Sequence, residues 1–196
     1  GKAKSASGMI AIGQEVKADN NNTIAIGVKT EATGNNGTAV GGYAKAIGTS
    51  SAAFGTQAVA NGLGATAFGP GASAGDGGTA ADGSTAVGRK STVTAEGGTG
   101  LGWATTVSAK DGTAIGHSAT ASIAGGVAIG SDSVTTAAAG VQGYNPASDR
   151  TNKYSAQAGA IGTSTLAAVS VGNGTTATRQ ITGLAAGTAD TDAVNV

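Results

Sequence analysis

Residues able to perform acid–base, nucleophilic or metal chemistry are few and scattered in this chain. His117 is the only histidine and cysteine is absent, so one chain offers neither a thiolate cage nor a multi-histidine metal site. Only three copies around a threefold axis would bring histidines together. The acidic residues show no paired spacing of a general acid with a general base, and no base recurs beside the serines and threonines. We therefore expect no enzyme activity, no catalytic residue, no bound metal and no cofactor.

The segment Gly75-Asp76-Gly77-Gly78 is similar to one copy of a calcium-binding nonapeptide repeat. That motif works by repetition, because the ion is bound between stacked copies. A single copy favours a plain surface loop over a calcium site, and titration calorimetry would distinguish the two.

Four residues have side chains suited to contacting a ligand: Trp103, Tyr144, Arg150 and Tyr154. Such residue types are enriched where interfaces concentrate their binding energy. The tyrosines and Arg150 lie in a stretch rich in charges and amides, which predicts a projecting loop at 141–158 that either recognises a ligand or packs on a neighbouring subunit. Trp103 is the sole tryptophan, and it is either an adhesive contact or a packing residue at a surface or an intersubunit seam.

The charge distribution excludes two classes of partner. Eleven basic and eleven acidic residues are scattered along the chain and cancel, so no basic stripe is available to bind nucleic acid. No apolar stretch reaches eighteen residues, so we expect no direct membrane contact from this segment.

An internal repeat dominates the chain and must position all of these residues. Nine glycines that each follow an apolar residue recur along the chain, and seven of the eight intervals between them are fourteen residues long. The repeat glycines are Gly13, Gly27, Gly41, Gly55, Gly69, Gly88, Gly102, Gly116 and Gly130. A fixed period indicates one small unit stacked on itself. The strict apolar period argues against the disorder that 36 glycines would otherwise suggest.

Each repeat contains the pattern of two short strands. Segments such as Ile24-Ala25-Ile26 alternate large and small residues, which predicts a strand that is apolar on both faces. A second alternation follows the glycine, as in Ala44 and Ala46. Glycines such as Gly48 fall at half-period, where we expect turns, because glycine reaches positive φ without steric cost. Fourteen residues then make two five-residue strands and two bends.

Stacked coils of this kind form an all-β solenoid in which each strand pairs in parallel with its equivalent, about 4.8 Å away. Roughly ten coils would make a rod on the order of 50 Å long. The first strand leaves one apolar face uncovered, and further copies of the same chain would cover it. We therefore expect an obligate homo-oligomer. The one longer interval predicts a surface loop at 71–83, and the coil pattern returns at Ala160-Ile161-Gly162 and Ser170-Val171-Gly172.

The coils with Ala-Ile-Gly or Ala-Val-Gly, followed by residues 168–172 and 179–195, resemble the YadA-like head and neck of the trimeric autotransporter adhesins. The resemblance covers most of residues 9–172 and then the neck. It places residues 1–172 in the head and 173–196 in the neck and the start of the stalk. Gly183 stands where the family commonly has asparagine, which puts any hydrogen bond from that amide in doubt. The matching neck positions are Arg179, Ile181, Leu184, Asp190, Asp192 and Val194.

The resemblance implies a left-handed parallel β-roll, a homotrimer and a neck that leads into a coiled-coil stalk. It also implies a non-enzymatic adhesin head on the bacterial surface, anchored in the outer membrane by a C-terminal barrel absent from this chain, with host extracellular matrix or cell-surface molecules as partners. A structural spacer that holds other adhesive domains away from the cell is the alternative. An ice-binding solenoid would need an unbroken row of threonines. Thr38, Thr66, Thr85, Thr99 and Thr113 share one position of the repeat, but Ile10, Ile24, Ala52 and Val127 occupy that position in other coils, so ice binding is disfavoured.

Overall fold

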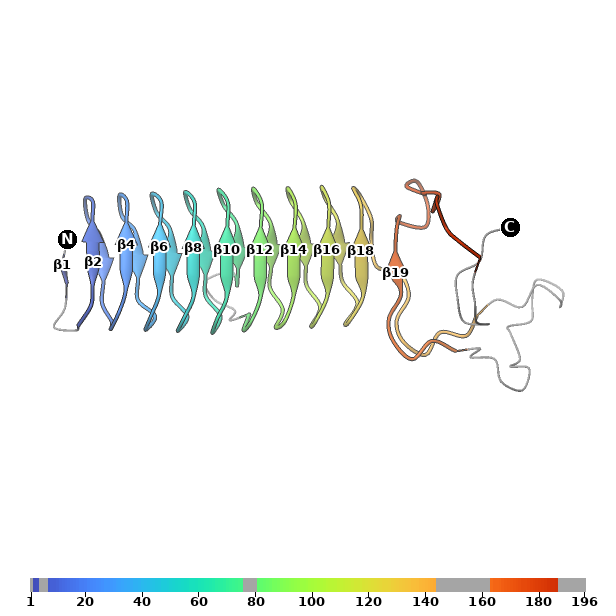
Figure 1. The fold of residues 1–196 in the computed structure, drawn as a ribbon, viewed down its shortest axis with the longest axis horizontal. Coiled ribbons are helices and arrows are strands. Elements are labelled where there is room, and N and C mark those ends of the chain that lie inside the picture. Colours follow the sequence, from blue (N-terminus) through green and yellow to red (C-terminus); the bar gives the residue numbers. More distant parts are fainter. Residues whose placement is uncertain (1, 4–6, 76–80, 144–162, 187–196) are drawn as a thin grey trace.

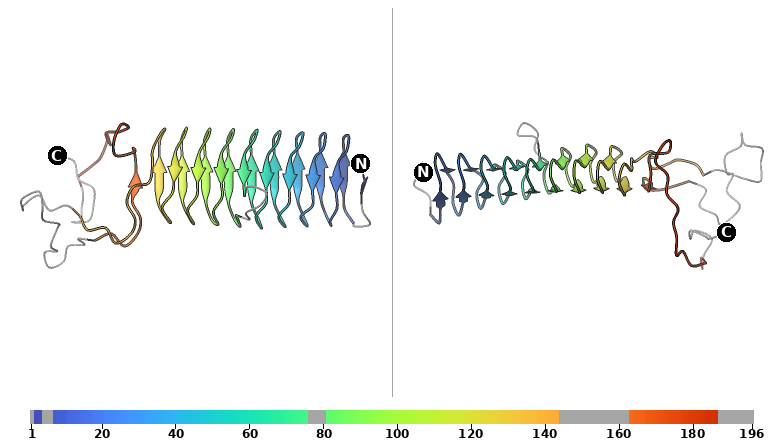
Figure 2. Two further views of the ribbon diagram at one scale, coloured as in Figure 1. Left: turned by 180° about the vertical axis from the view of Figure 1, so that it is seen from behind. Right: turned by 90° about the horizontal axis from the view of Figure 1, so that it is seen from above.

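The computed structural model describes residues 2–3, 7–75, 81–143 and 163–186. In these residues the chain is an all-β solenoid, and they contain no helix that could cross a membrane. The coils stack in a single line, with the N-terminus at one end and the C-terminus at the other (Figure 1). Seen from above, they form a narrow rod with one sheet on each side (Figure 2). The parallel solenoid expected from the repeat is confirmed.

The first strand of every coil joins a ten-stranded sheet, and the second joins a nine-stranded sheet. The ten-stranded sheet consists of β2 (Ile10–Ile12), β4 (Ile24–Ile26), β6 (Thr38–Val40), β8 (Ala52–Phe54), β10 (Thr66–Phe68), β12 (Thr85–Val87), β14 (Thr99–Leu101), β16 (Thr113–Ile115), β18 (Val127–Ile129) and β19 (Val169–Ser170). The nine-stranded sheet consists of β1 (Lys2–Ala3), β3 (Lys17–Ala18), β5 (Glu31–Ala32), β7 (Lys45–Ala46), β9 (Val59–Ala60), β11 (Ser73–Ala74), β13 (Thr92–Val93), β15 (Thr106–Val107) and β17 (Thr120–Ala121).

The strands have three and two residues, so the expected length of five is wrong. The reason is the space taken by the bends. Residues 13–15 and 20–22 each form a bend and turn in the first coil, and the same pattern recurs in the later regular coils as far as residue 125. Two chain reversals in fourteen residues leave few positions for sheet pairing, and the stacking of many coils compensates for the short strands.

Equivalent residues pair throughout the stack. Ile10 pairs with Ile24 fourteen positions along the chain, while Thr66 pairs with Thr85 across the longer interval. The insertion therefore leaves the register intact. It is also shorter than the loop expected at 71–83, because Ser73 and Ala74 form β11 and Ala81 is again buried. Residues 76–80, which include part of the expected calcium motif, lie outside the described residues.

Alanine is the main residue of the core between the two sheets, accompanied by three valines and eight buried serines and threonines among the described residues. The middle residue of a first strand, such as Ala53, and the inward residue of a second strand, such as Ala60, have no exposed surface. The largest completely buried side chains are Val93 and Val107, and Gly98 and Gly112 leave space beside them. The roll is thin because small side chains from the two sheets fill its interior, as the small residues in the sequence predict.

The half-period glycines do not have the role expected for them. Gly34, Gly48 and Gly62 have no positive φ, which occurs two residues later, for example at Asn36 (56°) and Ser50 (57°). They are glycine because the next coil lies too close for a side chain. A Cβ on Gly48 would overlap the carbonyl oxygen of Gly62 and stand 2.5 Å from its carbonyl carbon. Positive φ at Asn36 and Ser50 is tolerated without glycine.

The repeat glycines combine both constraints. Gly55 has φ of 129°, and a Cβ there would lie 2.6 Å from the carbonyl carbon of Gly69 in the next coil. L-residues rarely adopt this conformation, and the close stacking leaves no room for one. Each repeat glycine therefore marks a position where the backbones of successive coils come into close contact.

Candidate interaction surfaces

An apolar row runs along the outer face of the ten-stranded sheet, beside a row formed by the first residue of each strand that is mostly threonine. We call it the apolar ladder; it is formed by the last residue of each first strand. Its members are Ile12, Ile26, Val40, Phe54, Phe68, Val87, Leu101, Ile115 and Ile129. Four of them are exposed in the single chain, led by Ile12 (58%) and Phe68 (56%), and the other five are half-buried. The rings of Phe54 and Phe68 lie 5.9 Å apart between centroids. This surface is the uncovered apolar face expected from the sequence.

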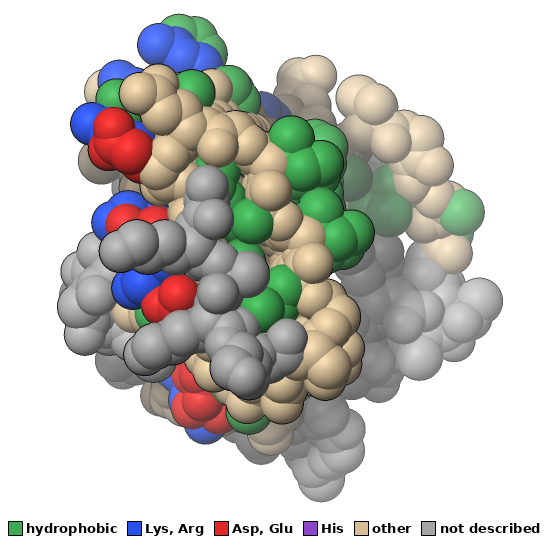
Figure 3. Space-filling model, turned by 90° about the vertical axis from the view of Figure 1, so that its left-hand side faces the viewer, with side chains coloured by type: hydrophobic (Ala, Val, Ile, Leu, Met, Phe, Trp, Pro, Cys, Tyr) green, Lys and Arg blue, Asp and Glu red, His purple; other side chains and the backbone are tan. Residues whose placement is uncertain are grey.

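Charged residues gather on the opposite flank of the roll. Viewed from its N-terminal end, the molecule shows hydrophobic side chains on one side and Lys, Arg, Asp and Glu on the other (Figure 3). Successive strands of the nine-stranded sheet carry Lys17, Glu31 and Lys45, and Lys45 Nζ lies 3.4 Å from Glu31. Such exposed pairs contribute little to stability. They make this flank hydrophilic, so the two faces of the roll differ in chemistry.

Further ion pairs form between the bends of neighbouring coils. Lys29 Nζ lies 3.7 Å from Glu15, and Lys110 Nζ donates a hydrogen bond of 3.0 Å to Glu96. That hydrogen bond to the Glu96 carboxylate raises the pKa of Lys110 above its ordinary value. In each pair the two residues are fourteen positions apart, so the repeat itself aligns their charges.

Trp103 lies within a stack of side chains. It directly follows a repeat glycine, as do Arg89 one coil earlier and His117 one coil later. The Arg89 guanidinium carbon is 5.4 Å from the Trp103 ring centroid, and the His117 ring centroid is 4.6 Å away. We call these three residues the indole stack. Sequence reasoning selected Trp103 but missed its neighbours, although their shared position in the repeat was a usable signal.

The other expected ligand contacts were Tyr144, Arg150 and Tyr154. They lie outside the described residues, as does most of the loop expected at 141–158. At the two ends of this segment, Gln142 and Thr163 form an antiparallel bridge.

The described residues contain no group of three or more His, Cys, Asp or Glu side chains that could hold a metal ion. His117 lies at the surface, where Nε2 is 3.3 Å from the Ser118 hydroxyl. The acids of the bends contact lysines, hydroxyls or backbone; Asp82, for example, accepts a hydrogen bond from the Leu63 amide.

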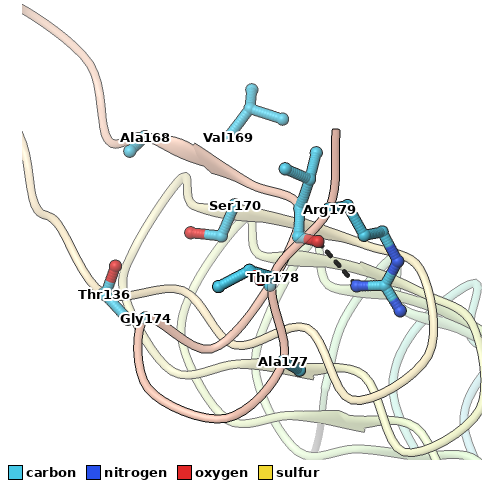
Figure 4. Close-up of a pocket in the computed structure, with 10 residues that line it drawn as sticks. Thr136, Ala168, Val169, Ser170, Gly174, Ala177, Thr178 and Arg179 are labelled. Atoms are coloured by element: carbon cyan, nitrogen blue, oxygen red, sulfur yellow. Dashed lines mark hydrogen bonds between the residues drawn. The ribbon is translucent and has the colours of Figure 1, made fainter. Parts of the chain in front are cut away.

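Arg179 fastens the C-terminal segment to the last regular coil. Its guanidinium donates to the Ser133 hydroxyl at 3.0 Å, to the Val171 carbonyl at 2.6 Å and to the Ser131 carbonyl. The bond to Val171 is visible in Figure 4, at the edge of an open pocket of about 340 Å³. A Cβ on Gly130 would lie 2.9 Å from the guanidinium carbon. Sequence reasoning selected Arg179 as a neck residue but did not predict these partners.

The remaining neck positions are only partly described. Ile181 is 66% exposed and Leu184 is half-buried. Asp190, Asp192 and Val194 lie outside the described residues. The return of the coil pattern at residues 170–172 is confirmed, because β19 pairs with β18 in the register of the other coils. Residues 160–162 are not described.

Comparison with known proteins gives matches to a family model and to solved structures, and no match among curated proteins. The model of the YadA head domain repeat matches residues 18–44, 46–72, 80–105 and 108–133. The crystal structure of the collagen-binding domain of the Yersinia adhesin YadA is similar to this chain, with 27% sequence identity and a TM-score of 0.52. That similarity covers 96% of this chain and 93% of the other. No curated protein matches. The matched segments span more than half of the chain and coincide with its coils, so this protein belongs to the family of YadA head domain repeats.

Proposed function

We propose that this chain is a non-enzymatic adhesin head that attaches a bacterium to host extracellular matrix or cell-surface molecules. The observation that carries the proposal is the likeness to a collagen-binding adhesin domain over nearly the whole chain. The architecture agrees with such a role, because a stiff rod displays side chains on its outside and needs no deep pocket. Weak contacts repeated over several chains then give avidity. Collagen is the first ligand to test.

The apolar ladder supports a homotrimer of left-handed rolls, the arrangement that the family resemblance implies. Exposed apolar patches of this extent are uncommon on monomeric proteins. Identical chains arranged about a symmetry axis would cover the ladder with one another and leave the charged flank in solvent. The proposed assembly thus uses both faces of the roll.

We assign residues 1–172 to the head and residues 173–196 to the neck and the start of a coiled-coil stalk, following the family resemblance. Arg179 supports this boundary, because two of its hydrogen bonds reach Ser131 and Ser133 in the last coil and a third reaches Val171 next to β19. The proposed location is the bacterial surface, where the stalk and an outer-membrane anchor would hold the head away from the cell.

Binding of the purified assembled chain to collagen tests this function. Triple-helical collagen is immobilised beside heat-unfolded collagen and serum albumin, and binding is measured by surface plasmon resonance. We expect saturable binding to the triple helix and none to albumin. The absence of binding to collagen and to a broad panel of other matrix proteins would refute the proposal.

The uniform stack of coils also suits a spacer that holds other adhesive domains away from the cell. Removal of residues 99–126 shortens the rod by two coils while keeping the register of its neighbours. If the segment is only a spacer, replacing these coils with two copies of coil 24–37 preserves attachment and deleting them weakens it. An adhesive surface in these coils is lost in both cases.

A further inference from the structure

The indole stack is held rigidly at one edge of the roll. The Ala104 amide donates to the Arg89 carbonyl at 2.9 Å, and the Ser118 amide donates to the Trp103 carbonyl at 3.0 Å. Each of the three stacked residues therefore lies on a bend whose backbone is tied to the next coil. A group fixed before binding loses little conformational entropy when a ligand arrives.

The stack leaves about half of the Trp103 side chain open to solvent. Arg89 approaches from the preceding coil and His117 from the following coil, so the two neighbours flank the indole. Trp103 nevertheless remains 51% exposed in the single chain. The three stacked side chains carry hydrogen-bond donors in the guanidinium, the indole N–H and the imidazole, and Lys90 follows Arg89 on the same bend. A ligand would therefore contact the part of the indole that Arg89 and His117 leave exposed.

Arg89 and Lys90 differ from the other cations of the described coils. Lys17, Lys29, Lys45 and Lys110 each have a carboxylate within 4.0 Å. Neither Arg89 nor Lys90 has one among the ion pairs of the described residues.

No acidic residue lies on the equivalent bend of the coil before Arg89 or of the coils that carry Trp103 and His117. Pro70 and Gly71 occupy the equivalent bend one coil before Arg89, and the first acid beyond the stack on this edge is Asp132, one coil after His117. The stack is therefore a local site of unneutralised positive charge on a chain whose formal net charge is zero.

We propose that Arg89, Lys90 and Trp103 form a binding site for a sulfated polysaccharide. Coils repeat about every 4.8 Å, so the donors form a row that an extended polyanion can follow without a pocket. An extended peptide would bind less well here, because it needs free backbone groups to pair with. The bend amides next to the stack already donate hydrogen bonds to neighbouring coils. The site is thus specific for dense negative charge.

The sole tryptophan makes a local test feasible. Heparin is titrated into the assembled chain while Trp103 fluorescence is recorded, with uncharged dextran and poly-glutamate as comparisons. We expect heparin to change the emission and dextran to leave it unchanged. Binding should weaken as salt is added, because exposed charges are screened.

Two pairs of substitutions place the site. The double variant Arg89→Gln and Lys90→Gln is expected to weaken heparin binding at least about tenfold, since hydrogen bonds to charged groups are lost. The matched double variant Lys45→Gln and Lys110→Gln removes the same charge elsewhere and is expected to change binding less than about twofold. Circular dichroism of both variants verifies that the roll is intact.

Several outcomes would overturn this inference. They are the absence of heparin binding, equal losses in both double variants, poly-glutamate binding as tightly as heparin, or failure of iodide to quench Trp103 in the assembled protein. The inference rests on the proposed attachment function and names one ligand class for it. Collagen binding is measured separately, so a head that binds collagen but not heparin would refute this site alone.

Discussion

Val93 occupies the space that a side chain at Gly100 would need. A Cβ on residue 100 would stand 3.1 Å from Cγ2 of Val93, 2.9 Å from the Ser91 hydroxyl and 2.8 Å from the Thr105 hydroxyl. Every other three-residue first strand has alanine at this central position. The one glycine therefore accompanies the larger side chains on the facing strand, and the coil keeps its volume.

This complementarity predicts coupling between the two positions. Gly100→Ala should lower the free energy of unfolding by about 1–3 kcal/mol through overpacking, and Val93→Ala by about 1–2 kcal/mol through a cavity. The double variant should lose less free energy of unfolding than the two single variants lose together. A double-mutant cycle based on denaturant unfolding measures the coupling, and strict additivity would show that the residues do not share space.

Substitutions at Gly48 and Gly64 separate the cost of overlap with the next coil from the cost of positive φ. Gly48→Ala introduces overlap with the backbone of the next coil and should cost about 3 kcal/mol or more. Gly64→Ala is the matched control, because Gly64 has φ of 65° but open space around its Cβ position, and it should cost only about 1–2 kcal/mol.

Hydrogen exchange of the neighbouring coils measures both glycine variants locally, which suits a repeat protein whose coils contact only their neighbours. Equal effects would show that close stacking on the next coil is not what selects glycine at position 48.

Loss of Arg179 should loosen the C-terminal end of the roll. Arg179→Met removes donors to the Ser131 and Val171 carbonyls and to the Ser133 hydroxyl, at a cost of about 1–2 kcal/mol. We expect faster hydrogen exchange in β18 and β19 while β2 to β8 are unaffected. Arg89→Met serves as the control, because that guanidinium contacts the Trp103 ring. Unchanged protection of β18 would contradict the role given to Arg179.

Assembly should depend on the apolar ladder and not on the opposite sheet. Leu101→Asp places a charge on the ladder, whereas Thr106→Asp places the same charge on the nine-stranded sheet five residues later. The first variant should shift the protein toward monomer, because a charge buried without a partner is costly. The second should leave its mass unchanged in sedimentation equilibrium. Dissociation by both variants, or by neither, would refute the proposed interface.

The repeat made most of the fold predictable. Large and small residues alternate in segments such as Ile24-Ala25-Ile26, and one such segment per coil sets strand position, pairing and the buried face at once. Strand length was not predictable, because it depends on how many residues the bends consume. The role of Gly48 was also missed, since a close approach between coils is a three-dimensional property.

The candidate surfaces were predictable to a smaller extent. The apolar ladder follows directly from the repeat, whereas Trp103 was identified from its residue type without Arg89 and His117. Those partners become neighbours only when coils are stacked. Arg179 was identified by resemblance, but its bond to Ser133 joins residues 46 positions apart, and no local pattern encodes it.

The insertion after Gly75 leaves Thr66 and Thr85 paired as though no residues had been added. Since the register is restored within one coil, residues can be inserted or deleted between coils without disturbing the pairing of the coils on either side. Recombination between the similar coding segments of two coils would change the reach of the rod in whole steps. Such exchange would alter the length of the roll while its backbone architecture stays the same.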